Sequence, residues 1–407
     1  MSGPAANRGI CVKNGLPITE AGCSLCGQCI THCPTGALTA RDDTDKILAA
    51  LADPEVITVV QVAPAVRTAW GEQLGLTPEQ ATPGRMAAAM RALGFDYVYD
   101  TDFAADLTIM EEASEFIEWV KEGKPRPMFT SCCPGWVRFA KQHYPQFVPQ
   151  LSTSKSPHQM MGAVVKNTMA KEAAEQGKRL FCLSIMPCVA KKYECDVPQL
   201  STEAGPDVDA VITTREFNRM IRMFGIDAAA LPETKFDDPL GLSTGAGTIF
   251  GRTGGVMEAA LRSAAYFLTG ENPAFTVCDT TAATPNRPWV DKEIEVAGLH
   301  LKIAISSGLQ NTSQLLDALE AGEVSYDFVE VMACPGGCVG GGGQPIVFNE
   351  ERAAGRAKIL NKLDGADKLR YSHENPDIQA LYDKWVGKPL SETAEEWLHT
   401  DQASWDI

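Results

Sequence analysis

Short apolar runs alternate with longer amphipathic stretches through most of this chain. Six runs are too short for helices and are typical of buried strands: 56–62, 128–131, 180–186, 208–213, 301–306 and 328–332. Between them, the segments 109–120 and 256–267 each place their apolar side chains on one helix face. Strands and helices that alternate in this way predict an α/β fold, in which helices flank parallel sheets.

The two ends of the chain differ from this middle part. Residues 1–45 contain five cysteines among glycines and prolines, and a helix is expected at 44–51 just behind them. Residues 371–407 contain three of the seven tryptophans, and Ile378, Leu381, Tyr382 and Trp385 have helical spacing. We therefore expect a cysteine-rich segment (1–45), a large α/β domain (46–370) and a tail (371–407) that docks on the body.

Composition and charge narrow the class of protein. The 407 residues are 44% hydrophobic and 22% charged, which is ordinary for a globular protein. The net charge of −16 disfavours binding to nucleic acid or to an anionic membrane. The longest apolar stretch, at 56–66, is too short to span a bilayer, and the N-terminus has no apolar segment typical of a signal peptide. We expect a cytoplasmic protein that binds neither nucleic acid nor membrane.

The N-terminal cysteines have the spacing of a bacterial ferredoxin, which binds a 4Fe-4S cluster. The run is Cys23-x-x-Cys26-x-x-Cys29-x-x-x-Cys33-Pro. In ferredoxins with two clusters the fourth cysteine of such a run binds the other cluster, but this chain has one full run only. Either Cys11 completes the site, which we favour, or Cys33 does. The spacing is unlike that of zinc sites.

Five further cysteines follow directly after expected strands: Cys132, Cys133, Cys188, Cys334 and Cys338. Open α/β sheets bind ligands at the carboxyl ends of their strands, so these thiols predict a second, buried cluster. The glycines at 336–343 allow the backbone to approach a large cofactor closely. Cys182, Cys195 and Cys278 fit better as small core residues.

Three segments resemble the signature loops of the FeFe (iron-only) hydrogenases: TSCCPGW at 130–136, MPCVAKKYE at 186–194 and MACPGGCVGGGGQP at 332–345. The similarity extends over nearly the whole chain and includes a tail like the family's small subunit. It implies two lobes with parallel sheets and, between them, an H-cluster, in which a 4Fe-4S cubane is joined to a two-iron centre with CO, cyanide and azadithiolate ligands. The implied activity is the reversible reduction of protons to dihydrogen. Ferredoxin or a similar small carrier would exchange electrons through the N-terminal cluster, and maturation proteins would insert the two-iron centre.

The resemblance also assigns roles to residues by their position. Cys133, Cys188, Cys334 and Cys338 would bind the cubane, and Cys338 would be shared with the two-iron centre. Cys132 would deliver protons, and Lys191 would donate a hydrogen bond to a cyanide ligand. Further residues would shape the pocket: Ala63, Pro64, Met186, Pro187, Phe250 and Met332. Ala65 and His158 are also expected there, but at these two positions the chain departs from one well-known subgroup of the family, which has Ser and Gln. For His158 we favour an ordinary hydrogen-bonded core histidine.

A proton route can be argued from helical spacing. On the expected helix at 109–120, Glu112 lies at the edge of the apolar face and Glu115 lies further toward the polar face. Buried carboxyl groups have raised pKa values and can exchange protons near neutral pH, and Ser152 could link the two. The resemblance gives the order Cys132, Glu112, Ser152, Glu115 and water. Glu111 and Glu118 are expected on the solvated face of the helix.

Two other functions compete with an enzyme. The first is a non-catalytic iron–sulfur assembly protein of a related eukaryotic branch, whose members typically lack the Cys132-Cys133 pair. The second is a hydrogen sensor, which would usually carry a signalling domain. The cysteine pair and the intact glycine loop favour the enzyme.

Overall fold

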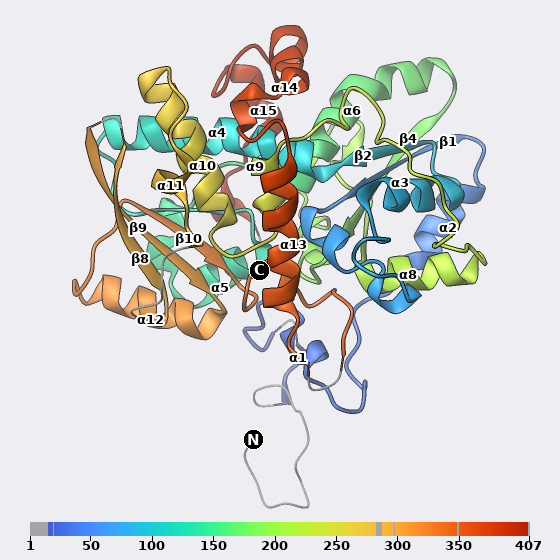
Figure 1. The fold of residues 1–407 in the computed structure, drawn as a ribbon, viewed down its shortest axis with the longest axis horizontal. Coiled ribbons are helices and arrows are strands. Elements are labelled where there is room, and N and C mark those ends of the chain that lie inside the picture. Colours follow the sequence, from blue (N-terminus) through green and yellow to red (C-terminus); the bar gives the residue numbers. More distant parts are fainter. Residues whose placement is uncertain (1–14, 19, 282–286, 297, 348–349, 406–407) are drawn as a thin grey trace, which may run out of the picture.

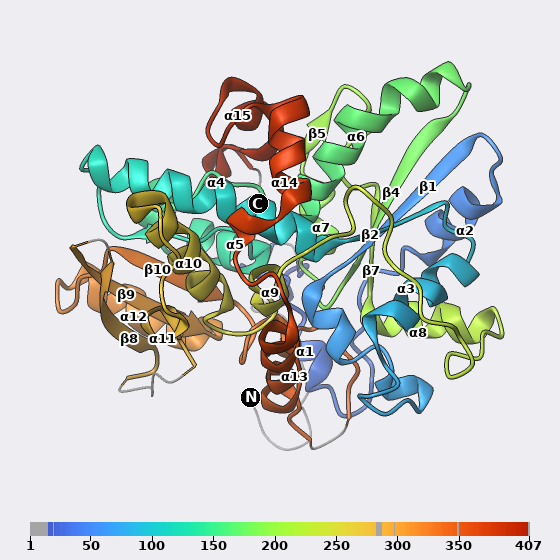
Figure 2. The same cartoon turned by 45° about the horizontal axis from the view of Figure 1, so that its top comes forward.

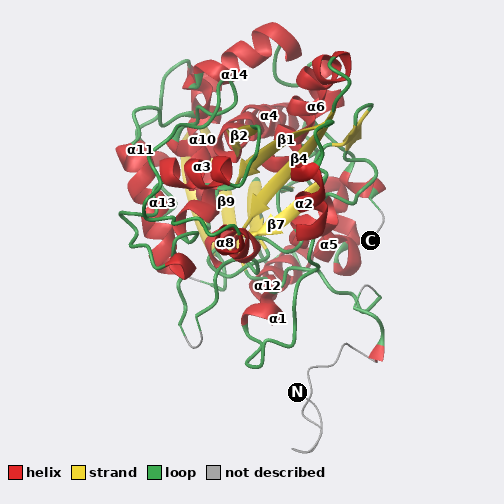
Figure 3. Cartoon of the chain, turned by 90° about the vertical axis from the view of Figure 1, so that its right-hand side faces the viewer, coloured by secondary structure: helices red, strands yellow, loops and turns green. Residues whose placement is uncertain are grey.

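The computed structural model describes the chain except residues 1–14, 19, 282–286, 297, 348–349 and 406–407. Two lobes lie side by side, and each contains a four-stranded sheet with helices on its faces (Figures 1 and 2). From the side, the strands lie inside a surround of helices (Figure 3). The α/β fold expected from the sequence is confirmed, as are the two lobes that the resemblance implied.

The first lobe contains four parallel strands in the order β2–β1–β4–β7. Its central strands, β1 (Val56–Val62) and β4 (Arg179–Met186), are almost entirely buried, because helices cover both faces of the sheet. β2 (Tyr97–Asp100) and β7 (Ala210–Thr213) form the edges. Since all four strands are parallel, the loops that follow them leave the sheet at one edge.

The second lobe contains a sheet of order β3–β10–β9–β8. β3 (Met128–Phe129), β10 (Phe328–Met332) and β9 (Leu299–Ser307) are parallel, and β8 (Val290–Val296) pairs antiparallel with β9. All six expected runs form strands, but β2 and β8 were not expected. β2 has only four residues, and the sequence of β8, VDKEIEV, alternates apolar with charged residues.

One long helix connects the two lobes. α4 (Thr101–Lys121) begins directly after β2 and contacts α6, α9 and α10 (Figure 1). The other α-helices in the described part of the chain are α1 (Gln28–Thr31), α2 (Thr44–Ala52), α3 (Pro83–Ala92), α5 (Pro134–His143), α6 (Pro157–Glu175), α7 (Lys191–Glu194), α8 (Thr214–Met223), α9 (Gly245–Ile249), α10 (Gly255–Thr269), α11 (Phe275–Cys278), α12 (Leu309–Glu320), α13 (Ala353–Ala366), α14 (Pro376–Leu381) and α15 (Glu392–Leu398). A small hairpin is formed by β5 (Ser201–Thr202) and β6 (Gly205–Pro206).

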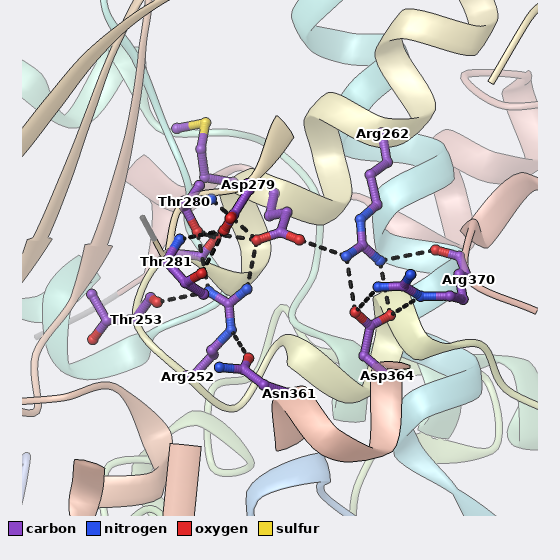
Figure 4. Close-up of polar contacts among 12 residues, drawn as sticks. Arg252, Thr253, Arg262, Asp279, Thr280, Thr281, Asn361, Asp364 and Arg370 are labelled. Carbon is purple, nitrogen blue, oxygen red and sulfur yellow. Dashed lines mark hydrogen bonds and ion pairs between the residues drawn. The ribbon is translucent and has the colours of Figure 1, made fainter. Parts of the chain in front are cut away.

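A buried network of charges joins α10 to α13 (Figure 4). Arg262 on α10 pairs with Glu258 one turn earlier and with Asp364 on α13, the latter at 3.0 Å. Arg370 pairs with Asp364 and Arg252 pairs with Glu258, each at 2.6 Å. Each buried charge therefore has an opposite partner, which avoids the large cost of an unpaired charge in the interior.

The tail docks on the body through α14 and α15. Ile378 and Leu381 are buried, as their helical spacing predicted, and Trp405 is buried as well. Trp385 has the same helical spacing but is 42% exposed. The chain changes from an α-helix to a π-helix at Tyr382–Val386. A π-helix has more residues per turn, so Trp385 is rotated out of the apolar face.

Candidate active site

Loops from both sheets meet at a small apolar cavity of about 80 Å³. The loops follow β1 and β4 in the first lobe and β3 and β10 in the second. The lining residues are Ala63, Pro64, Ala65, Thr101, Cys132, Cys133, Pro134, Pro157, His158, Met186, Pro187, Cys188, Lys191, Phe250, Gly251, Met332 and Cys338. The structure therefore places all eight expected pocket residues around one cavity, together with Cys132 and Lys191.

The four thiols expected to bind the cubane are close neighbours. Cys133, Cys188 and Cys338 border the cavity, and Cys334 is buried. Burial and the nearby Cys133 raise the pKa of Cys188 to about 12. Burial together with Cys188 and Cys133 raises the pKa of Cys334, and burial with the same two cysteines raises that of Cys338. Cys133 and Cys188 are thus near enough to disfavour ionisation of both Cys334 and Cys338.

This donor set fits an iron–sulfur cubane. Four buried thiolates cannot coexist without added positive charge, and iron provides that charge in Fe–S clusters. Among the residues that the structure describes, no three His, Cys, Asp or Glu side chains lie close enough together to bind one metal ion between them. A cubane makes a different demand, because each of its four thiolates binds a separate iron atom.

The glycine loop packs directly against two cysteine loops. A Cβ atom on Gly341 would lie 2.2 Å from the carbonyl oxygen of Pro187, and one on Gly342 would lie 2.5 Å from that of Cys26. Gly337 has φ +90°, a conformation that favours glycine. The glycines are therefore required for loop-to-loop packing, in addition to the close approach to a cofactor that the sequence suggested.

The N-terminal cysteine segment lies against this site. Burial and the neighbouring Cys26 and Cys23 raise the pKa of Cys29, so these three thiols are grouped. Cys26 in turn helps to raise the pKa of Cys133 and Cys334 in the buried site. Cys33 contacts the Thr35 hydroxyl at 3.6 Å, and this contact and nearby backbone N–H groups lower its pKa to about 7. Cys11 lies outside the described residues.

Lys191 and Glu194 form a charged pair at the wall of the cavity. The Lys191 ammonium donates to Glu194 at 2.8 Å and to the Cys132 carbonyl at 3.0 Å. Burial acts to raise the pKa of Glu194, but Lys191 and His158 lower it to about 2. Burial and the Lys191 charge lower the pKa of His158 to about 4, so its neutral ring donates from Nε2 to Glu194. His158 is thus a hydrogen-bonded core histidine that also lines the cavity.

Glu112, Ser152 and Glu115 lie together behind Cys132. Burial and the Glu115 charge raise the pKa of Glu112 to about 8, and among the described residues neither Glu112 oxygen has a hydrogen-bond partner. The Ser152 hydroxyl donates to Glu115 at 2.6 Å. Burial and the Glu112 charge also raise the pKa of Cys132. The structure therefore brings together the four protein groups of the expected proton route.

The prediction of a solvated Glu111 is wrong, whereas Glu118 is exposed as expected. Glu111 is fully buried because Tyr382, Leu390 and His399 in the tail supply hydrogen-bond partners. Those partners lie more than 250 residues away, so helix periodicity could not reveal them.

Sequence reasoning also missed Glu194, although its spacing of three residues from Lys191 was a usable signal. Cys182, Cys195 and Cys278 are buried core residues, as predicted.

Three family models match this chain. The model of the iron only hydrogenase large subunit, C-terminal domain, matches residues 56–342. The iron hydrogenase small subunit matches residues 350–402, and a 4Fe-4S binding domain matches residues 16–39. The chain therefore belongs to the iron-only hydrogenase family.

Relatives of two kinds are similar over most of this chain. The NADP-reducing hydrogenase subunit HndD of Solidesulfovibrio fructosivorans is 47% identical over 95% of this chain, which spans 66% of that relative. The cytosolic Fe-S cluster assembly factor narfl of Xenopus tropicalis is 30% identical over 94% of this chain and 83% of its own length. An apo variant of the FeFe-hydrogenase HydA1 from Chlamydomonas reinhardtii has a TM-score of 0.78 at 40% identity, covering 88% of this chain and 98% of that one.

In the part of the chain that the structure describes, no helix is both long enough and apolar enough to cross a membrane.

Proposed function

We propose that this chain catalyses the reversible reduction of protons to dihydrogen. The observation that carries the proposal is the position of Cys132. Its thiol borders the same cavity as three of the four grouped thiols, and Glu112 behind it is close enough to raise its pKa. A thiol that lies between a cofactor site and a buried acid is suited to proton transfer.

The cofactor site would be an H-cluster held by this chain's own thiolates. Cys133, Cys188, Cys334 and Cys338 would bind the cubane, and Cys338 would also bind the two-iron centre. When bound, that centre supplies the redox chemistry at which protons and electrons combine. Lys191 has three N–H donors, and its bonds to Glu194 and the Cys132 carbonyl leave one for an anionic ligand of the cofactor. The apolar lining, with Met186, Phe250 and Met332 among it, excludes water.

Protons would pass along the side chains in the order that the resemblance implies, and the hydrogen bond from the Ser152 hydroxyl to Glu115 supports the outer half of that order. Glu115 takes a proton from water, the Ser152 hydroxyl passes it inward, and Glu112 holds it before Cys132. The pKa of about 8 for Glu112 allows it to gain and lose a proton near neutral pH. One helical turn after Glu115 on α4, the Trp119 indole donates to the Pro125 carbonyl at 2.9 Å.

Electrons would enter through the N-terminal segment, for which we propose the bounds 1–45, with the catalytic domain at 46–370 and the tail at 371–407. Cys23, Cys26 and Cys29 would bind a 4Fe-4S cluster, with Cys11 as the fourth ligand and Cys33 as the alternative. Ferredoxin or a similar carrier would deliver the electrons, dedicated maturation proteins would complete the H-cluster, and the protein would work in the cytoplasm.

A cytosolic iron–sulfur assembly role is the competing proposal. It draws on the 30% identity to an assembly factor over most of the chain. Cys132 argues for the enzyme, because cluster transfer has no need of a thiol placed beside a buried proton-exchanging carboxyl.

Hydrogen evolution separates the two. The chain is produced anaerobically with and without hydrogenase maturation proteins, loaded with iron and sulfide, and supplied with reduced methyl viologen. The proposal predicts steady hydrogen evolution from the matured sample only. A matured sample that holds both cubanes and the two-iron centre but evolves no hydrogen would contradict it and favour the assembly role.

A further inference from the structure

A second set of hydrogen bonds runs from Glu115 into the C-terminal tail. Residues of the tail pair with the segment that follows Ser152: the Lys155 N–H donates to the Leu398 carbonyl at 2.7 Å, and the Thr400 N–H donates to the Thr153 carbonyl at 2.8 Å. This pairing places the His399 side chain beside Thr153, and only 5% of His399 is exposed. His399 is therefore fixed next to the outer end of the proposed proton route.

The directions of these hydrogen bonds assign the protons. Glu115 Oε1 accepts from the Thr153 N–H at 2.9 Å and from the Thr153 hydroxyl at 3.0 Å. A hydroxyl has a single proton, so Thr153 Oγ1 must accept from His399 Nδ1, which lies at 2.8 Å. On the other side of the ring, His399 Nε2 lies 3.0 Å from Glu111 Oε2.

Glu111 is an acceptor at both of its oxygens. The Tyr382 hydroxyl donates to Oε1, and the Leu390 N–H donates to Oε2 at 2.9 Å. A carboxylate has no proton to donate, so Glu111 Oε2 accepts a hydrogen bond from the His399 Nε2–H. His399 then donates from both nitrogens, which is the pattern of an imidazolium.

The charges around the ring agree with that assignment. Burial acts to lower the pKa of His399, but the hydrogen bond and charge of Glu111, with the charges of Glu115 and Glu395, raise it above its ordinary value of 6.5. Glu395 is exposed and on the tail, whereas Glu111 and Glu115 come from α4. The tail thus places one cation between two buried carboxylates.

We propose that His399 is a positioning residue of the proton route and is supplied by the tail. By donating to Thr153, it turns the Thr153 hydroxyl toward Glu115. It thereby fixes the Glu115 carboxylate with Oε2 facing Ser152, ready to accept a proton. This inference rests on the proposed function and adds that a docked tail is needed for full turnover.

Two variants test the link, and a third serves as a matched control. Thr153→Val removes the hydroxyl, and His399→Gln removes the charge. His373→Gln changes another buried tail histidine, which bonds to Ser263 and Asn272 away from the route. Hydrogen evolution is measured against pH in the matured full-length chain, with iron content and melting temperature recorded for each variant.

We expect Thr153→Val and His399→Gln to lower turnover by roughly three- to tenfold. This is less than the roughly 100-fold or more that direct proton transfer contributes, because both residues only position Glu115. In the unmodified chain, we expect turnover to fall as pH rises through the raised pKa of His399, because the imidazolium is then lost. His399→Gln should lack that fall, and His373→Gln should keep it. An unchanged profile in His399→Gln, or the same change in His373→Gln, would overturn the proposal.

A measurement without turnover keeps this inference separate from the proposed function. Histidine-labelled full-length chain is titrated by NMR, with and without Glu111→Gln. We expect a His399 pKa above its ordinary value of 6.5 that is lower in the variant, since the hydrogen bond to the Glu111 carboxylate and its charge are then lost. A His399 pKa below 6.5 would refute the inference even in an active hydrogenase. An inactive matured chain with the raised value would refute the proposed function and leave the charge assignment intact.

Discussion

At the scale of single residues, the site depends on groups that are held in unusual protonation states. Burial keeps the Cys132 thiol and the Glu112 carboxyl protonated at neutral pH, whereas Lys191 and His158 keep Glu194 ionised. Each protonation state depends on identified neighbouring residues, so a single substitution can change one state at a time. The proposed proton route is therefore open to test one side chain at a time.

Cys132→Ser should lower hydrogen evolution without changing how much cofactor the chain binds. Cys132 is not one of the four proposed cubane ligands, so iron content should stay unchanged. A serine hydroxyl is far less acidic than a thiol, so hydrogen evolution should fall by about 100-fold or more. Cys182→Ala, in the core beside α6, serves as a control that changes a cysteine away from the cavity. Near-normal turnover in Cys132→Ser would remove Cys132 from the route.

Glu112→Gln should change how stability depends on pH. Folding raises the pKa of Glu112 from 4.5 to about 8, so the folded chain keeps a proton that the unfolded chain loses. The stability associated with this carboxyl is full below pH 4.5 and is lost as pH rises to about 8, at roughly 1.4 kcal/mol per pH unit. The melting temperature of Glu112→Gln, relative to the unmodified chain, should therefore rise between pH 5 and pH 8. A constant difference would show that Glu112 is ionised in the folded protein.

At the scale of elements, the strand-end loops and the glycine loop bring distant cysteines together. The sheets bring β1 and β4 to one side of the cavity and β3 and β10 to the other. The glycine loop then connects this cavity to the N-terminal segment at Gly342. Electron entry should therefore depend on backbone packing as well as on ligands.

Gly342→Ala tests that packing. The added methyl group would lie 2.5 Å from the Cys26 carbonyl oxygen and 2.9 Å from Gly27, both of which are backbone. Neither can move as a flexible side chain would, so we expect the melting temperature to fall and electron entry from ferredoxin to slow. Gly355→Ala on α13 is the matched control, because nothing lies within 4 Å of its added methyl group. Equal behaviour of the two variants would contradict this role for the glycine loop.

Cys33→Ser and Cys11→Ser distinguish the two proposed ligand sets of the N-terminal cluster. Cys33 contacts Thr35, whereas Cys23, Cys26 and Cys29 are grouped. We expect Cys33→Ser to keep the cluster and Cys11→Ser to lose about four iron atoms per chain. The signal of the reduced N-terminal cluster in electron paramagnetic resonance, together with iron analysis, would show whether each variant keeps that cluster. The reverse result would make Cys33 the ligand.

At the scale of the whole molecule, α4 packs against both lobes and carries the two carboxyl groups of the proposed proton route, and the tail contacts α4 beside them. α4 carries Glu111, Glu112 and Glu115. His399 of the tail contacts Glu111 directly and contacts Glu115 through the Thr153 hydroxyl. The cofactor site and its proton supply therefore share one helix. A change in tail docking should affect turnover without changing any proposed metal ligand.

Much of this arrangement could be predicted from the sequence. The apolar runs located the strands that end at the cavity, because buried parallel strands have few polar residues. Helix periodicity separated Glu112 from the exposed Glu118 but failed for Glu111, whose partners are contributed by the tail. β8 was missed because an edge strand with alternating charges lacks a continuous apolar run. Contacts between distant segments, such as Thr153 with His399, leave no local pattern.

The infrared spectrum of the matured protein, recorded with its iron content, is the sharpest test of the proposed H-cluster. We expect bands of CO and cyanide ligands together with about ten iron atoms per chain, four for each cubane and two for the second centre. Replacing Cys338 with Ala should abolish those bands. If the bands stay absent from a chain that holds both cubanes, this chain does not bind an H-cluster.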